Sequence, residues 1–169
     1  MNDTPLKDDM LQAMRRLAKS VTIITTSNGQ QRFAMSATAV DSLSTEPPSL
    51  LICVNKTASL HAVLDAGADF CVNILGLQQE ELSHLCSGPI KGEARFQRGD
   101  WRQGEDGIPY LADAQSAILC QQDGKFSYGT HSIFIGRIRQ IRNSEEITPL
   151  VYLNGAYTTT AATPLAAAS

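Results

Sequence analysis

The feature that most constrains the fold is a series of short apolar or β-branched runs, each about one strand long and bounded by turn-forming residues. These runs cover residues 21–26, 49–55, 69–75, 114–121, 132–141 and 150–157. Only three short helices are expected among them, so strands do not alternate regularly with long crossover helices. The pattern predicts a mainly β fold, an antiparallel barrel with short peripheral helices, rather than a doubly wound sheet.

Local signals place the other elements. Thr4 and Pro5 have the form of a helix start, and apolar residues then recur at helical spacing through Ala18. The run at 21–26 leads into Asn28-Gly29, a strong hairpin signal, and strand character resumes near Arg32. Short helices are expected at 59–66, where Gly67 ends the helix, and at 77–86.

Two stretches lack a regular pattern. Residues 87–109 contain five glycines and two prolines, and a loop of this length is usually functional or disordered. Residues 158–169 are rich in Thr and Ala and are expected to form a disordered tail. With 169 residues in all, we expect one domain over 1–157.

Composition excludes several classes of function. Fourteen basic against seventeen acidic residues give a net charge of −3, with no basic run that could follow a phosphate backbone, so a nucleic-acid partner is not expected. No apolar stretch approaches the ~18 residues needed to cross a bilayer, and the first residues do not resemble a signal peptide. We therefore expect a soluble cytoplasmic protein with no membrane association.

The cysteines and the common motifs exclude further classes. The four cysteines form no C-x-x-C pair, and three lie in apolar runs, so buried free thiols are expected. His84 and Cys86 match no zinc-site spacing, and no metal is predicted. The glycine-rich fingerprints of Rossmann dehydrogenases and P-loop enzymes and the nucleophile motif of α/β-hydrolases are also missing.

Residues 35–44 carry hydroxyls at Ser36, Thr38, Ser42 and Ser44, always an even number of positions apart. In one extended chain these hydroxyls would share a face. Such a face, polar but uncharged, suits a ligand with several oxygens, such as a ribityl chain or a phosphate. The alternative is a solvent-exposed strand edge.

Three other places could carry chemistry, and each has a structural alternative. Residues 55–59 (Asn-Lys-Thr-Ala-Ser) follow a buried strand and suit an anion site, although Ser59 could simply be an N-cap. Residues 93–96, with Trp101, could form a lid over a ligand, or their aromatics could only hold the loop to the body. His131 opens an apolar strand, where a histidine is either functional or structural.

Taken in order, these segments resemble a known family. The matching segments are Met35 to Val40, Ser42-Leu43-Ser44, Pro47-Pro48, Cys53 to Lys56, Phe70 to Leu75, Arg95-Phe96, Trp101, Gly129-Thr130-His131 and Gly136. In order and spacing, from about Met14 to Tyr157, the chain resembles the short-chain flavin reductases. These are the reductase components of two-component flavin-dependent monooxygenases, such as 4-hydroxyphenylacetate 3-monooxygenase.

The resemblance implies an FMN-binding split β-barrel that forms a homodimer, with flavin in a groove between the subunits. It implies hydride transfer from NADH or NADPH to FMN or FAD, and diffusion of the reduced flavin to a partner monooxygenase. The alternative within the same fold is a tightly FMN-bound electron-transfer or flavin-binding protein without turnover of free flavin.

The resemblance also assigns residues. It places Ala37, Thr38, Ala39 and Val40 along the flavin ring, Ser42 and Ser44 near the ribityl-phosphate, Asn55, Lys56 and Ser59 along the same polar wall, and Ala94, Arg95 and Phe96 over the flavin. His131 is the predicted catalytic residue, on the nicotinamide side. Many members read Gly-Asp-His where this chain has Gly129-Thr130-His131, so a positioning role is expected rather than acid–base chemistry.

Overall fold

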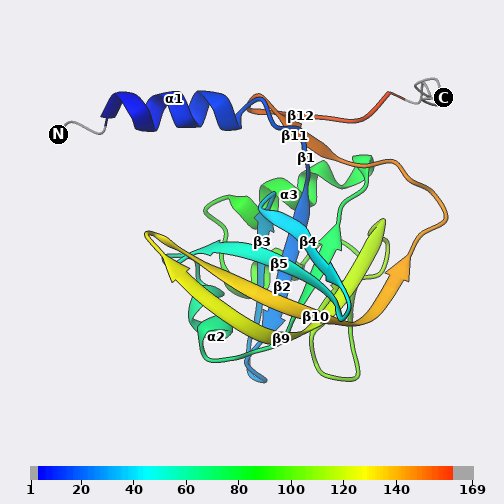
Figure 1. Ribbon diagram of the computed structural model, residues 1–169. Coiled ribbons are helices and arrows are strands. Elements are labelled where there is room, and N and C mark those ends of the chain that lie inside the picture. The colour runs from blue at the N-terminus through cyan, green and yellow to red at the C-terminus, as the bar shows by residue number, and fades with distance from the viewer. Residues whose placement is uncertain (1–3, 162–169) are drawn as a thin grey trace.

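The computed structural model describes residues 4–161, and its centre is a seven-stranded antiparallel sheet (Figure 1). The strand order across the sheet is β3 (Arg32–Ala37), β2 (Thr22–Ser27), β6 (Phe70–Ile74), β9 (Ser116–Tyr128), β10 (His131–Asn143), β5 (Pro48–Asn55) and β4 (Val40–Thr45). The prediction of a mainly β, antiparallel fold is confirmed.

The two edge strands of this sheet are neighbours in the sequence. β3 ends at Ala37 and β4 begins at Val40, so the three Cα steps between them span at most about 11 Å. Seven flat strands would place the edges nearly 30 Å apart, at about 4.8 Å per step. The sheet therefore has to curl until its edges approach each other, as Figure 1 shows. Within residues 4–161, no ladder joins β3 to β4.

Smaller elements surround the sheet. They are α1 (Thr4–Met14), α2 (His61–Asp65), α3 (Glu80–Ser87), the 3-10 helices η1 (Leu77–Gln79) and η2 (Gly92–Phe96), a sheet of β1 (Lys19–Ser20), β11 (Val151–Leu153) and β12 (Ala156–Thr158), and a ribbon of β7 (Trp101–Gln103) and β8 (Pro109–Leu111). The helices predicted over 5–18, 59–66 and 77–86 are confirmed, with ends shifted by a few residues.

The first hairpin follows the local prediction. β2 pairs with β3 from Thr22 opposite Ala37 to Ser27 opposite Arg32. In the turn, Gly29 has a φ of 86°, and the Asn28 side-chain oxygen accepts hydrogen bonds from the backbone N–H groups of residues 30 and 31. Asn-Gly favours such a turn because both residues tolerate unusual backbone angles.

The predictions for the second half need correction. The single strand predicted over 150–157 is wrong, because the chain turns at Asn154 and Gly155, which have φ values of 51° and 82°, and forms the β11–β12 hairpin. Residues 87–109 contain η2 and β7 rather than only irregular loop. The predicted tail begins at Thr158, the last residue of β12, and residues 162–169 lie outside the described part, so the tail stays a prediction.

Part of the core lies inside the curled sheet, and another part lies between the sheet and α3, η2 and β8. The largest fully buried side chains of the core include Phe70, Phe134 and Ile52. Cys71, Cys86 and Cys120 are buried free thiols, as expected, whereas Cys53 is only partly buried. Burial raises the pKa of Cys86 to about 11 and that of Cys120 to about 12, so these thiols stay protonated and unreactive at neutral pH.

No helix within residues 4–161 is long and apolar enough to span a membrane.

Candidate functional site

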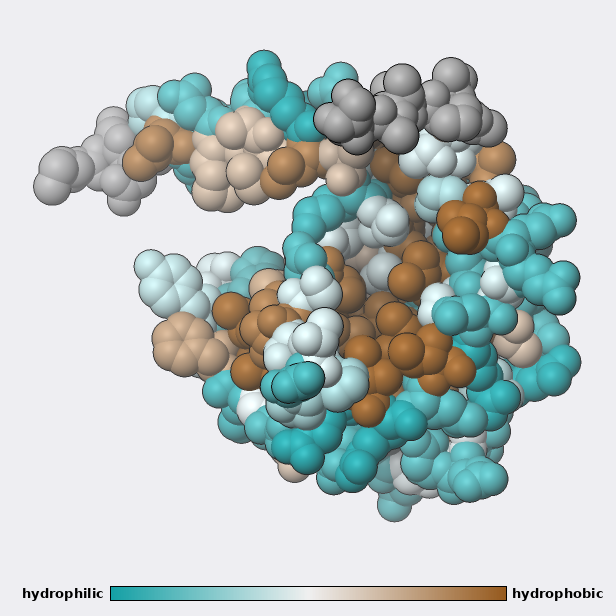
Figure 2. Space-filling model, turned by 45° about the vertical axis from the view of Figure 1, so that its right-hand side comes forward, coloured by the Kyte–Doolittle hydropathy of each residue, from teal (hydrophilic) through white to brown (hydrophobic). Residues whose placement is uncertain are grey.

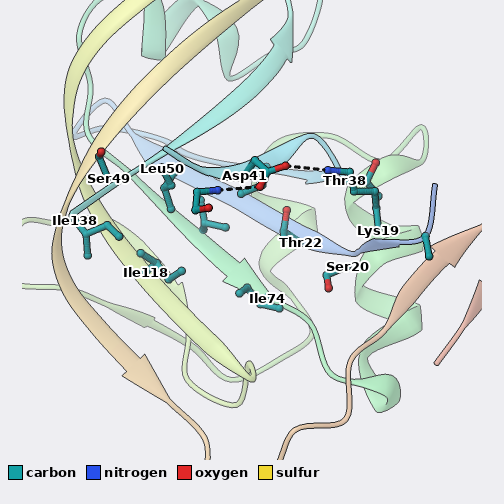
Figure 3. Close-up of a pocket in the computed structure, with 14 residues that line it drawn as sticks. Lys19, Ser20, Thr22, Thr38, Asp41, Ser49, Leu50, Ile74, Ile118 and Ile138 are labelled. Carbon is teal, nitrogen blue, oxygen red and sulfur yellow. Dashed lines mark hydrogen bonds and ion pairs between the residues drawn. The ribbon is translucent and has the colours of Figure 1, made fainter. Parts of the chain in front are cut away.

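A groove of about 440 Å³ lies beside β4, and we call it the β4 groove (Figure 3). Its floor is apolar and comes from Leu50, Val72, Ile74, Ile118 and Ile138 on four strands of the main sheet. Hydroxyl groups and two charged side chains lie along the rest of its wall: Ser20, Thr22, Thr38, Ser42, Ser49, Lys19 and Asp41. An apolar floor with a polar margin suits a flat ring system whose edges carry hydrogen-bonding groups.

The charged groups of the β4 groove form an ion pair. Lys19 Nζ lies 3.2 Å from Asp41 Oδ2, and the two side chains are 37% and 66% exposed. The pair joins β1 to the edge strand β4. An ion pair this exposed contributes little to stability, so either partner is available to a ligand at small cost.

The predicted hydroxyl face over residues 35–44 is wrong as a single surface. The extended chain breaks between β3 and β4, and β4 has a bulge between Ser42 and Ser44, so the alternation of sides is lost twice. Ser36 donates to the carbonyl of Ser83 at 2.7 Å, in the body of the protein. Only Thr38 and Ser42 line the β4 groove.

Ser44 belongs to a local turn. Its hydroxyl donates to the carbonyl of Glu46 at 3.0 Å and accepts from the N–H of Glu46 at 3.1 Å. The difference between Ser42 and Ser44 gives a matched pair of variants.

Replacing Ser42 with alanine is expected to raise the KM for the groove's ligand by roughly five- to tenfold and to leave kcat nearly unchanged. A contact that does not change during the reaction affects binding rather than the chemical step. Ser44→Ala should leave both constants unchanged, because its hydroxyl is used in the turn. Steady-state kinetics on the two variants is the measurement, and equal effects would show that Ser42 makes no ligand contact.

The other predicted residues of this stretch contribute differently. Val40 lines the β4 groove. The Ala37 carbonyl accepts the Thr22 hydroxyl at 2.7 Å, and the Ala39 carbonyl accepts the Cys53 N–H at 2.9 Å. Ala37 and Ala39 therefore fix the backbone at the edge of the groove.

Asn55, Lys56 and His131 form a second cluster, where β5 ends and β10 begins. His131 and Asn55 are paired across the two strands. Lys56 donates from Nζ to the Gly129 carbonyl and from its backbone N–H to the Thr130 carbonyl, both at 2.9 Å. The structure thus brings together residues that the sequence separates by more than seventy positions.

Two details of this cluster bear on the predictions. The Thr130 hydroxyl lies 2.8 Å from Nδ1 of the exposed His131, so a hydroxyl rather than a carboxylate occupies the position that orients the ring. Ser59 is exposed, and Leu60 rather than Ser59 is the N-cap of α2. The N-cap alternative for Ser59 is therefore wrong.

The η2 residues lie in another place. Arg95 donates to the carbonyls of Ala34, Ile90 and Gly88 at 2.5, 2.7 and 3.1 Å, which fixes the segment 88–95 to β3. Phe96 is 8% exposed, and its ring meets that of Trp101 edge-on at 5.0 Å. These contacts support the structural alternative for the aromatics.

Ala94 lines a groove different from the β4 groove. This groove has a volume of about 650 Å³ and is bordered by Glu81, His84, Leu85, Ile90, Gln97 and Arg98. Within one chain, residues 94–96 are therefore not among the residues that line the β4 groove.

Several residues that line the β4 groove were not predicted from the sequence. Ile118 and Ile138 have no local signal, because strand pairing alone brings them together. Lys19 and Asp41 carry a weak signal: Lys19 directly precedes the run at 21–26, and Asp41 is the one charged residue of β4.

Comparison with known proteins is consistent with this geometry. Residues 14–161 match the profile of the family described as "Flavin reductase like domain". The chain is 43% identical, over 85% of its length and 82% of the relative's, to the reductase component of the FADH(2)-dependent resorcinol hydroxylase of Rhizobium sp. (strain MTP-10005).

Two more similarities cover most of the chain. It is 36% identical to the FMN reductase (NADH) RutF of Stutzerimonas stutzeri, over 90% of this chain and 87% of the relative. Among solved structures, a flavin reductase from Haemophilus somnus 129PT, described in its own title as putative, superposes with a TM-score of 0.87. It is 33% identical, over 90% of this chain and 98% of the other.

Proposed function

The chain belongs to the flavin reductase like domain family and is an NAD(P)H-dependent flavin reductase, and we propose that the β4 groove is where it holds the flavin. The reduced flavin is the product that a separate monooxygenase consumes. The observation that carries the site assignment is the groove itself, with its apolar floor, its hydroxyl margin and the family's matching segment, residues 38–42, along one wall. Its volume lies within the usual range for small-molecule sites.

The position of each residue in the groove determines its part in hydride transfer. The apolar floor excludes water and supports the ring, while the hydroxyls of Thr38 and Ser42 bind its polar groups. The bound flavin supplies the redox chemistry, so the protein needs no nucleophile, only accurate placement of donor and acceptor. Ala37, Ala39 and Val40 shape the wall.

Asn55, Lys56 and Ser59 continue the polar wall in this proposal, and His131 meets the nicotinamide. Val40 pairs with Ile52, and Asn55 lies three residues further along β5, or about 10 Å. That separation suits a ligand that extends beyond the groove. Arg95 and Phe96 hold η2 in place. Because Ala94 lines a different groove of its own chain, we place it near the flavin of the other copy in the proposed dimer.

We also propose that the protein is a homodimer, because a single chain leaves apolar surface exposed. α1 projects from the body, and its apolar side faces an apolar patch across a hollow (Figures 1 and 2). Leu6 is 73% exposed, and Phe126 and Tyr128 on the β9–β10 hairpin are 62% and 79% exposed. Exposed apolar surface of this kind marks an interaction site, and a second copy of the chain is the occupant that we propose.

The finer architecture is part of the proposal too. The curled sheet with adjacent edges supports a split β-barrel, within a domain over 1–157 followed by a tail over 158–169. A cytoplasmic location, as expected from the sequence, is also part of the proposal.

The activity test uses NADH or NADPH with added FMN or FAD in air. We expect NAD(P)H to be consumed only when flavin is present, with continued turnover as oxygen reoxidises the product. A protein that binds flavin but never consumes NAD(P)H would support the electron-carrier alternative, which the reductase names of the relatives do not favour.

The dimer makes a separate prediction. Replacing Leu6 and Met10 together by aspartate should convert the protein to a monomer, because two charges would be buried on the apolar side of α1. Gln12→Asp, on the opposite side of the helix, should leave the dimer intact. Light scattering measures the mass, and a wild-type monomer with full activity would contradict the proposal.

A further inference from the structure

The ion pair between Lys19 and Asp41 lies on the wall of the groove in which we place the flavin ring (Figure 3). Among residues 4–161, Lys19 is the only basic residue that lines this groove, and Asp41 is the only acidic one. The floor of the groove is formed by aliphatic side chains, such as Ile74 and Ile118. Charges interact more strongly beside such apolar surface than in water, so this pair acts on the charge of the molecule that the groove holds.

The two partners of the ion pair are held differently. Asp41 Oδ1 accepts the backbone N–H of Ser42 at 3.1 Å, which leaves Oδ2 for the Lys19 ammonium at 3.2 Å. The Lys19 backbone pairs with Tyr152 of β11, but within residues 4–161 its ammonium has no hydrogen bond other than the one to Asp41. Because the lysine stem is long and flexible, the ammonium can leave Asp41 while the carboxylate stays in place.

Hydride transfer changes the charge in this groove. The hydride carries two electrons and one proton from NAD(P)H to a neutral flavin ring, so the reduced ring is an anion and the nicotinamide is left as a cation. An ammonium group stabilises such an anion as it forms, whereas it gains little from a neutral ring. Lys19 supplies a positive charge on this wall, and Asp41 competes for that charge.

We propose that Lys19 is a further catalytic residue, whose ammonium stays with Asp41 while the ring is oxidised and turns to the ring as the hydride arrives. Asp41 pairs with the ammonium again when the reduced flavin leaves. Lys19 therefore favours reduction, and Asp41 limits how tightly the reduced product is held, which suits a reductase that releases its flavin. The inference rests on the proposed function, because it takes the flavin ring to occupy the β4 groove.

The test compares the affinities of the protein for oxidised and reduced riboflavin. Riboflavin has the flavin ring but no phosphate, so an attraction of Lys19 to a phosphate does not contribute. Fluorescence quenching gives the affinity for the oxidised form, with no nicotinamide present. The reduction potentials of bound and free riboflavin, measured without oxygen, then give the affinity for the reduced form.

Variants of the pair should shift these affinities in opposite directions. Lys19→Met should weaken reduced riboflavin about tenfold and leave oxidised riboflavin nearly unchanged, which lowers the potential of the bound ring by about 30 mV. Asp41→Asn keeps the oxygen that accepts the Ser42 N–H but loses the charge, so it should tighten reduced riboflavin a few-fold. Lys19→Arg keeps the positive charge and should stay close to the wild-type protein. An unchanged ratio of the two affinities in Lys19→Met would overturn the proposal.

A matched control is present in the same chain. Lys125 and Asp65 form a surface ion pair at 2.8 Å, and neither residue lines the β4 groove. Lys125→Met removes one positive charge, as Lys19→Met does, and should leave both riboflavin affinities unchanged. An equal shift in the two lysine variants would show that net charge, and not Lys19, acts on the reduced ring, and would also overturn the proposal.

Ser42→Ala distinguishes failure of this inference from failure of the proposed function. If the β4 groove holds the ring, this variant should weaken oxidised and reduced riboflavin alike. An unchanged ratio in Lys19→Met would then remove only the role of Lys19. If neither Ser42→Ala nor Lys19→Met changed riboflavin binding, the flavin would bind outside the β4 groove, and the site assignment would be wrong as well.

Discussion

Replacing His131 by alanine is expected to lower kcat/KM for NADH by up to about a hundredfold, with little change in flavin KM or in Tm. The side chain is exposed at the start of β10, so its loss leaves no cavity and no unpaired buried group. The neighbouring Thr130 hydroxyl holds the imidazole at Nδ1 and leaves the other ring nitrogen for the nicotinamide. A hydroxyl cannot stabilise a charged imidazole as a carboxylate would, so we expect the effect of positioning alone.

The control is another histidine of the same chain. His61 lies 2.9 Å from the Ser132 hydroxyl and meets the ring of Phe134 edge-on at 5.6 Å. His61→Ala should lower Tm and affect NADH and flavin kinetics alike, which is the behaviour of a structural histidine. If His131→Ala behaved in that way, with NADH kinetics no more affected than flavin kinetics, His131 would be structural as well.

Local sequence signals predicted most of the helices and strands, but they could not predict which distant strands pair. Asn28-Gly29 fixed the first hairpin because its turn depends on two adjacent residues. The same dipeptide at Asn154-Gly155 lies inside an apolar run, and the run predicts one strand where the structure has a hairpin. The strand order could not be predicted from local signals. β6 lies between β2 and β9, and that placement depends on packing throughout the core.

The same difference between local and long-range signals applies to the residues of the site. Thr38 and Ser42 are indicated by both the even spacing and the resemblance, Val40 by the resemblance alone, and all three line the β4 groove. The spacing also indicates Ser36 and Ser44, and the resemblance Ser44, but neither lines it, because the extended chain is interrupted between β3 and β4 and by the bulge in β4. Lys19 joins the site because the curled sheet places β1 beside β4. No local signal in the sequence indicates that these two segments meet.

The second large effect concerns Gly136, one of the residues behind the family resemblance. A Cβ built at this position would lie 2.5 Å from Cζ of Phe70 and 2.7 Å from Cβ of Cys120. Phe70 is fully buried and Cys120 nearly so, and neither can move without disturbing its own strand. The glycine therefore allows the Phe70 ring to pack directly against the backbone of β10.

Gly136→Ala is expected to lower the free energy of unfolding by about 3 kcal/mol, near the upper end for an overpacked core. For a chain of this size that corresponds to a fall in Tm of roughly 6–12 °C. Gly124→Ala on β9 is the control, because its Cβ would meet only Ile135, at 3.5 Å, an ordinary contact distance. Thermal unfolding of both variants is the measurement.

A double variant identifies the cause of the loss. Phe70→Leu removes the ring atom that lies closest to the new Cβ, so Gly136→Ala should cost less in the Phe70→Leu background than in the wild-type chain. Strictly additive losses would show that the strain comes from the contact with Cys120 or from the backbone of β10 instead. A non-additive recovery would show that Gly136 is required by the Phe70 ring, which would give a packing reason for one residue of the family pattern.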